Sequence, residues 1–226
     1  MITRNQGIVL GLLWLGDWAL GFWAIATSPD RVPVHWNWKG EVDRYGSPWE
    51  LGILAPLLFT ITLAVLPSLP YLSSQSGALK RSGPMYGRMI IIFAITIIAM
   101  NAAMICLGGN HPSYLLRMVL VTLAMMLLIV GNWMGKIRRN SVMGIRTPWT
   151  LKSDYVWERT HRLGGRLQVA HGISVLLAAF LLPVWAGIVV LMGGLLLLCA
   201  WAMFYSRSLA RGESRDHDQS QPVVVP

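Results

Sequence analysis

The sequence predicts an all-α integral membrane protein with six transmembrane helices and with both termini in the cytoplasm. Apolar residues make up 54% of the 226 residues and charged residues only 13%, a balance that a water-soluble domain of this size cannot bury in its core. Long apolar segments recur along the chain, and Lys and Arg gather in the segments on one side of the predicted membrane.

Four apolar segments are each close to the roughly 20 residues that cross about 30 Å of hydrocarbon. They lie at 7–27, 51–72, 89–107 and 115–134. The segment 168–205 is too long for one span, and Pro183 near its middle predicts a tight hairpin between a fifth and a sixth helix. The predicted organisation is a first helix hairpin (1–72) with a structured outer loop (28–50), a second helix hairpin (73–134), a cytoplasmic loop (135–167), a third helix hairpin (168–205) and a disordered cytoplasmic tail (206–226).

The Lys and Arg residues predict the orientation, because short cytoplasmic loops retain them. With the N-terminus inside, 15 of the 19 Lys and Arg residues lie in segments on the cytoplasmic side. The net charge of +9 follows from this topology, so the basic composition does not indicate nucleic-acid binding.

The outer loop contains more turn-forming and polar residues than a simple connection needs. Residues alternate between Val32 and Trp38, which predicts an extended segment with His35 and Asn37 on the same side as Pro33. Two interpretations remain open: the polar side chains only cap turns at the membrane surface, or the loop binds a ligand. The candidate binding residues are His35, Asn37, Gly40, Asp43 and Tyr45.

The inner loop after the fourth span is the longest polar segment. Pro148 ends any helix before it, and Ser153 with Asp154 predicts the start of a helix that leads into the fifth span. On this helix Asp154, Trp157, Glu158 and His161 share one face, and Glu158 can pair with Arg162. These residues predict a hydrogen-bonded and salt-bridged segment.

No metal or cofactor is expected. His35, Asp43 and His111 are suitable ligand types, but they come from different loops, so their spacing gives no support for a metal site. Glu158 and His161 superficially resemble the carboxylate–histidine pair of di-iron helices, which needs a second copy that this chain lacks.

Four polar residues lie within predicted spans. Asp17 is at the midpoint of the first helix, where an unpaired carboxylate costs about 3 kcal/mol, so we expect it to face the bundle with Asn101 as its partner. His171 and Asn132 lie near the cytoplasmic ends of their spans and are predicted to meet below the inner loop. A packing role and a role in a ligand or proton pathway both remain open for these residues.

The two loops together resemble the SdpI-type immunity proteins of bacteria. The outer segment Pro33-x-His35-x-Asn37-x-x-Gly40-x-x-Asp43 is similar to the N-terminal domain of unknown function in that family, and the inner segment 140–162 is similar to its C-terminal signature. The inner candidate residues are Asn132, Asn140, Gly144, Arg146, Thr147, Pro148, Trp149, Thr150, Trp157, Glu158, Thr160 and His161.

The resemblance implies a protein of the bacterial inner membrane that gives resistance to an extracellular, membrane-active peptide toxin. It also implies a receptor role, in which a cytoplasmic transcriptional repressor is recruited to the membrane. The alternative is a transporter or membrane enzyme that uses polar residues in the spans and the inner loop. These residues are Asp17, Asn101, Asn132, Arg146, His161 and His171. No recognised catalytic, phosphate-loop or metal motif supports a reaction class, which disfavours an enzyme.

Overall fold

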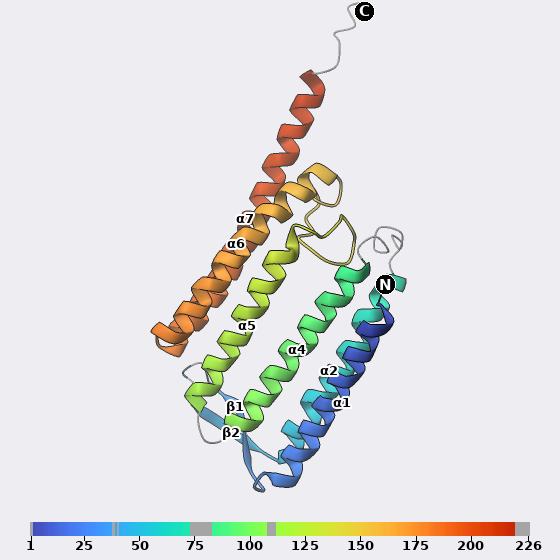
Figure 1. Cartoon of the computed structure of the whole chain (residues 1–226). Helices are drawn as coiled ribbons and strands as arrows, with labels where there is room; N and C mark the ends of the chain where they lie inside the picture. Colours follow the sequence, from blue (N-terminus) through green and yellow to red (C-terminus); the bar gives the residue numbers. More distant parts are fainter. Residues whose placement is uncertain (1, 38, 40, 73–82, 108–111, 220–226) are drawn as a thin grey trace, which may run out of the picture.

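Six long helices cross the length of the molecule in the computed structural model, which describes residues 2–37, 39, 41–72, 83–107 and 112–219 (Figure 1). The helices are α1 (Arg4–Thr27), α2 (Pro48–Leu72), α4 (Gly83–Leu107), α5 (Pro112–Met134), α6 (Asp154–Leu181) and α7 (Val184–Gln219). Within the described residues, these six helices are long and apolar enough to span a membrane, so the predicted all-α transmembrane fold is confirmed.

The helices form two neighbouring groups. Helices α1, α2 and α4 pack against one another, α5 packs on α4, and α6 and α7 complete the second group. The first group has a core that includes Leu10, Phe59 and Ile90, and the second has one that includes Ala124 and Val175. Large apolar side chains also cover the outside of the helices, where lipid rather than water is their natural solvent.

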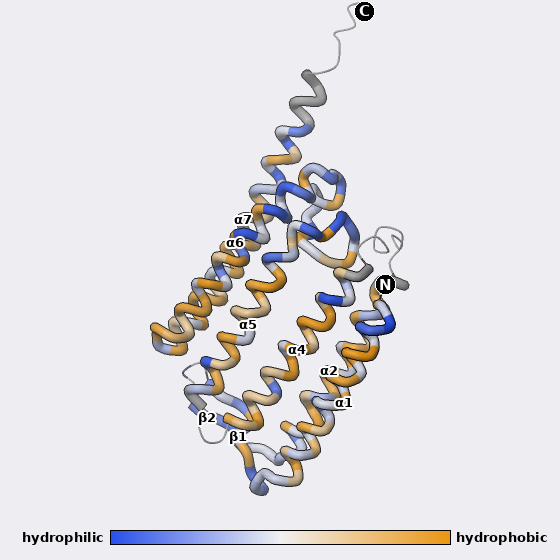
Figure 2. The backbone as a smooth tube through the Cα atoms, viewed as in Figure 1, coloured by the Kyte–Doolittle hydropathy of each residue, from blue (hydrophilic) through white to orange (hydrophobic). Residues whose placement is uncertain are grey.

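Helix α1 begins and helix α7 ends at the same end of the bundle, together with the loop 135–153 (Figure 1). The loop 28–47 and the α6–α7 turn lie at the opposite end. Hydrophobic residues line the middle of the helices, whereas hydrophilic residues gather at the end that carries the loop 135–153 (Figure 2).

The boundaries of α6 follow from local chemistry. The side chain of Ser153 accepts a hydrogen bond from the backbone N–H of Val156, which caps the helix at the predicted position. The helix ends at Leu181, and Pro183 lies in the turn before α7, so the predicted tight hairpin is present. Because α6 already begins at Asp154, the predicted loop 135–167 consists of the loop 135–153 followed by the first part of α6.

The prediction of a disordered tail from residue 206 is wrong as far as Gln219, because α7 continues to that residue. No proline interrupts the sequence between Pro183 and Pro222. The side chain of Ser153 also donates a hydrogen bond to Glu213 Oε1 at 2.9 Å, which holds this extension against the start of α6. Residues 220–226 lie outside the described residues.

The loop between α1 and α2 contains a short β-hairpin. Strand β1 (Val32–Trp36) pairs antiparallel with β2 (Val42–Gly46). The predicted extended segment corresponds to β1, but the register shifts on both sides of His35, so the alternation of faces is not regular. As a result Pro33 is buried while His35 is exposed, contrary to the predicted shared side.

Candidate functional site

Two candidate surfaces lie at opposite ends of the bundle, and the first is the β-hairpin. His35 Nδ1 lies 2.6 Å from Asp43 Oδ1 across the two strands, and the side chains are 63% and 42% exposed. Asn37 closes the connecting turn, because its Oδ1 accepts hydrogen bonds from the backbone N–H groups of Lys39 and Glu41. The structure therefore brings His35 and Asp43 together at the surface and gives Asn37 the turn-capping role. Gly40 lies outside the described residues.

The hairpin is anchored to the start of α2 by an ion pair that the sequence analysis missed. Arg44 Nη1 donates to Glu50 Oε2 at 2.8 Å, and Glu50 Oε1 accepts from the backbone N–H of Ser47. Tyr45, a predicted binding residue, is exposed next to this ion pair in the sequence. The ion pair links strand β2, which carries Asp43, to the start of α2.

The second surface is the loop 135–153, which packs on a buried imidazole. The ring of His161 is fully buried and stacks on Trp157, with ring centroids 4.0 Å apart. His161 Nε2 accepts a hydrogen bond from the backbone N–H of Ile145 at 2.8 Å, so Nδ1 carries the proton and donates it to the Trp157 carbonyl. The neutral form of the His161 imidazole therefore holds the loop.

Gly144 lies against the Nε2 edge of this imidazole. Its backbone φ of +108° is a value that residues other than glycine rarely adopt. A Cβ atom at this position would lie 2.4 Å from His161 Nε2 and 3.2 Å from the Trp157 ring. Both the backbone conformation and the space therefore require glycine here.

Two buried threonines connect the loop to α7. The hydroxyl of Thr147 donates to Ser206 Oγ at 2.9 Å, and the hydroxyl of Thr150 donates to the Ile145 carbonyl at 2.8 Å. Each threonine hydroxyl also accepts a hydrogen bond from the backbone N–H of the other. Ser206 was not among the predicted residues, because no local pattern links it to a loop almost 60 residues earlier.

Asn140 and Trp157 fix the first half of the loop. Asn140 is buried, and its Oδ1 accepts hydrogen bonds from the backbone N–H groups of Val142 and Met143, both at 2.8 Å. The Trp157 indole donates to the Ile137 carbonyl at 2.8 Å. Buried side chains thus satisfy loop main-chain groups that would otherwise lack partners away from water.

Several of the other inner candidate residues lie at the surface. Arg146, Pro148, Glu158 and Asn132 are exposed, and Trp149 is half-buried. Glu158 pairs with Arg162 at 2.5 Å as predicted, and Arg139 pairs with Asp154 at 2.7 Å. Thr160 is fully buried, and its hydroxyl has no hydrogen-bond partner within the described residues.

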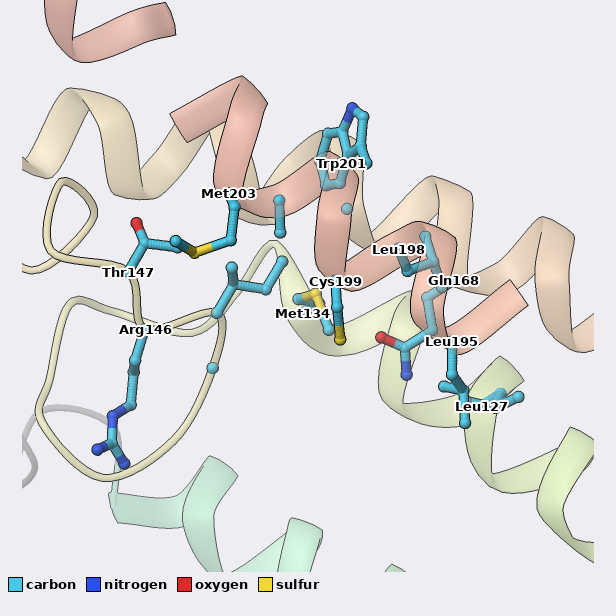
Figure 3. A pocket seen from close by; sticks show the side chains of 14 residues that line it. Leu127, Met134, Arg146, Thr147, Gln168, Leu195, Leu198, Cys199, Trp201 and Met203 are labelled. Carbon is cyan, nitrogen blue, oxygen red and sulfur yellow. The ribbon is translucent and has the colours of Figure 1, made fainter. Parts of the chain in front are cut away.

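An apolar groove of 390 Å³ lies where the loop meets α5, α6 and α7 (Figure 3). Met134, Gln168, Cys199 and Trp201 are among its lining residues. The guanidinium of Arg146 points away from these side chains in Figure 3, and it donates to the Val142 carbonyl at 3.1 Å. The groove therefore offers mainly apolar contacts.

The predicted contact between Asp17 and Asn101 is present inside the bundle. Asn101 Nδ2 donates to Asp17 Oδ1 at 2.8 Å, and both residues are buried. Within the described residues, Asp17 Oδ2 and Asn101 Oδ1 have no hydrogen-bond partner. The indoles of Trp14 and Trp18 donate instead to Thr60 Oγ1 on α2, at 2.8 and 3.2 Å.

The predicted contact between His171 and Asn132 is wrong. His171 Nε2 bonds the Leu191 carbonyl of α7 at 3.2 Å, and its ring lies against Gly194, whereas Asn132 is exposed on α5. The six polar residues of the transporter or enzyme alternative therefore do not form one cluster, since Asp17 bonds Asn101, His161 bonds the loop and His171 bonds α7. Among the described residues, no three His, Cys, Asp or Glu side chains are grouped to hold a metal ion, and His111 lies outside them.

Comparisons with known proteins match both loops. The sequence model of the SdpI/YfhL protein family matches residues 136–206, and a domain of unknown function, DUF1648, matches residues 12–60. The immunity protein SdpI of Bacillus subtilis (strain 168) is 24% identical over 152 residues, which cover 67% of this chain and 70% of that relative. No solved structure matches.

Proposed function

The chain belongs to the SdpI/YfhL protein family, and from this premise we propose that it gives its bacterium immunity to a membrane-active peptide toxin that arrives from outside the cell. The observation that carries the proposal is the similarity to an immunity protein over two thirds of the chain. The same similarity and the six spans identify a multi-pass protein of a bacterial membrane.

The β-hairpin is the surface that meets the toxin in this proposal. It lies at the end of the bundle opposite the loop 135–153, and most Lys and Arg residues lie on the side of that loop, which favours an external hairpin. The exposed His35–Asp43 pair and the exposed rings of Tyr45 and Trp49 give this surface hydrogen-bonding groups and aromatic groups for a peptide at the membrane boundary.

The loop 135–153 is the surface that meets a cytoplasmic partner, and the resemblance implies a transcriptional repressor in this role. Its buried side chains hold the main chain in one conformation, while Arg146 and Pro148 are exposed. The helices connect the hairpin to the loop. A toxin that binds the hairpin can change the loop only if toxin binding favours one of two arrangements of these helices.

Deletion of the gene in its native bacterium tests the immunity proposal. We expect conditioned medium from dense parental cultures to reduce survival of the deletion strain, and a plasmid copy of the chain to restore it. Equal survival of the deletion strain and the parent in media from all growth phases would contradict the proposal.

A further inference from the structure

A polar trough on the surface between α5 and α6 has no role in the function proposed above. It consists of two adjoining hollows of 350 and 400 Å³ that share Gly135 and Arg162 among their lining residues. The side chains that line them carry five positive and two negative charges, from Lys136, Arg138, Arg139, Arg162 and Arg166 and from Asp154 and Glu158.

The two carboxylates leave most of the positive charge without a partner. Asp154 pairs with Arg139, and Glu158 pairs with Arg162. Within the described part of the chain, Lys136, Arg138 and Arg166 form no ion pair, and all three are exposed. An anion in the trough would therefore meet a local excess of positive charge.

The floor of the trough is formed by close approach of the two helices. A Cβ atom on Gly131 would lie 2.9 Å from the Gly165 carbonyl, and one on Gly165 would lie 2.5 Å from the Gly131 carbonyl. Asn132 lies on the rim with its side chain exposed. The absence of side chains at the two glycines therefore lets the backbones of α5 and α6 approach closely beneath the basic residues.

On each helix, the face that carries the trough changes from polar and basic side chains to apolar side chains. Lys136 lies in the turn just after α5. On α5 itself, Asn132 is followed toward the bundle centre by Ile129 and Met125, which lie on the same face and are 37% and 45% exposed. On α6, Arg166 is followed in the same way by Ile173 and Leu177, which are 47% and 54% exposed. The surface is therefore basic at the membrane boundary and apolar below it.

We propose that this trough binds an anionic phospholipid. Its phosphate lies beside Lys136 and Arg166, and its acyl chains follow the exposed apolar faces of α5 and α6. The match of positive charge with a phosphate, and of apolar faces with acyl chains, distinguishes this occupant from a soluble anion and from a neutral lipid.

Thermal unfolding of the purified full chain in detergent tests the proposal, with phosphatidylglycerol, phosphatidylcholine or inorganic phosphate added separately. We expect phosphatidylglycerol to raise the melting temperature more than either other addition. The double substitution K136Q/R166Q should weaken the apparent affinity for phosphatidylglycerol by about fivefold or more for each charge removed. Both side chains are exposed and unpaired, so the variant should fold normally.

The matched control is R207Q, which removes an exposed charge from α7 away from the trough. Its affinity for phosphatidylglycerol should equal that of the unmodified chain. Equal stabilisation by phosphatidylcholine, full stabilisation by inorganic phosphate alone, or an equal loss of affinity in R207Q would each overturn the proposal.

Discussion

His161 connects the loop 135–153 to α6 through a single ring. Its Nε2 accepts the Ile145 N–H, its Nδ1 donates to the Trp157 carbonyl, and Gly144 lies against its Nε2 edge. A buried backbone N–H without a partner costs about 1–3 kcal/mol, so the loop conformation depends strongly on this contact.

Substitution of Gly144 tests this dependence. G144A places a Cβ atom against His161 and forces a side chain into a positive-φ conformation, so we expect it to lower stability by about 1–3 kcal/mol. The matched control is G135A, because a Cβ atom there would make only an ordinary 3.5 Å contact with Arg162. Thermal unfolding in detergent measures both variants, and equal melting temperatures would contradict the packing described for the loop.

Asp17 allows a second test at the residue scale. Its Oδ2 and the Oδ1 of Asn101 lack partners among the described residues, and the neutral acid would supply a donor. D17N supplies a donor with the same shape, so we expect it to keep the melting temperature. D17L removes the acceptor of the Asn101 amide and should cost on the order of 1 kcal/mol. Equal damage by the two substitutions would show that the bundle requires the carboxylate itself.

Some side-chain contacts could be predicted from the sequence and others could not. The partnership of Asp17 with Asn101 could be predicted, because a carboxylate inside a span needs a polar partner and few are available. The partnership of Thr147 with Ser206 could not, because common hydroxyl residues far apart in the sequence give no signal before the helices are placed.

At the scale of elements, the spans were predictable from their apolar length, whereas two other features were not. The hairpin strands have only five residues each, and their pairing depends on the turn that Asn37 closes. The polar composition of the α7 extension predicts disorder, but polarity alone does not prevent a helix that has packing partners.

The β-hairpin gives a functional prediction at this scale. The double substitution H35A/D43A removes the exposed pair but keeps Asn37 and the Arg44–Glu50 anchor, so the hairpin should stay folded. We expect survival in toxin-containing medium to fall to that of the deletion strain, with unchanged abundance in the membrane. R31Q is the control, because it changes an exposed charge just before β1 and should keep protection. Full protection by H35A/D43A would show that this pair has no part in immunity.

At the scale of the whole molecule, the six helices separate the hairpin surface from the surface of the loop 135–153 by the length of the bundle. The hairpin surface is fixed by one ion pair to α2, whereas the loop surface is fixed by buried hydrogen bonds to α6 and α7. The immunity proposal requires these two surfaces to lie on opposite sides of the membrane, with the hairpin outside.

Thiol labelling of intact cells tests this central claim most directly. In a background with Cys106 and Cys199 replaced by alanine, single cysteines are introduced as S47C beside the hairpin and S208C on α7, two exposed positions at opposite ends. A membrane-impermeant maleimide should label S47C in intact cells and S208C only after the cells are opened. Labelling of S208C in intact cells, with S47C protected, would contradict the account.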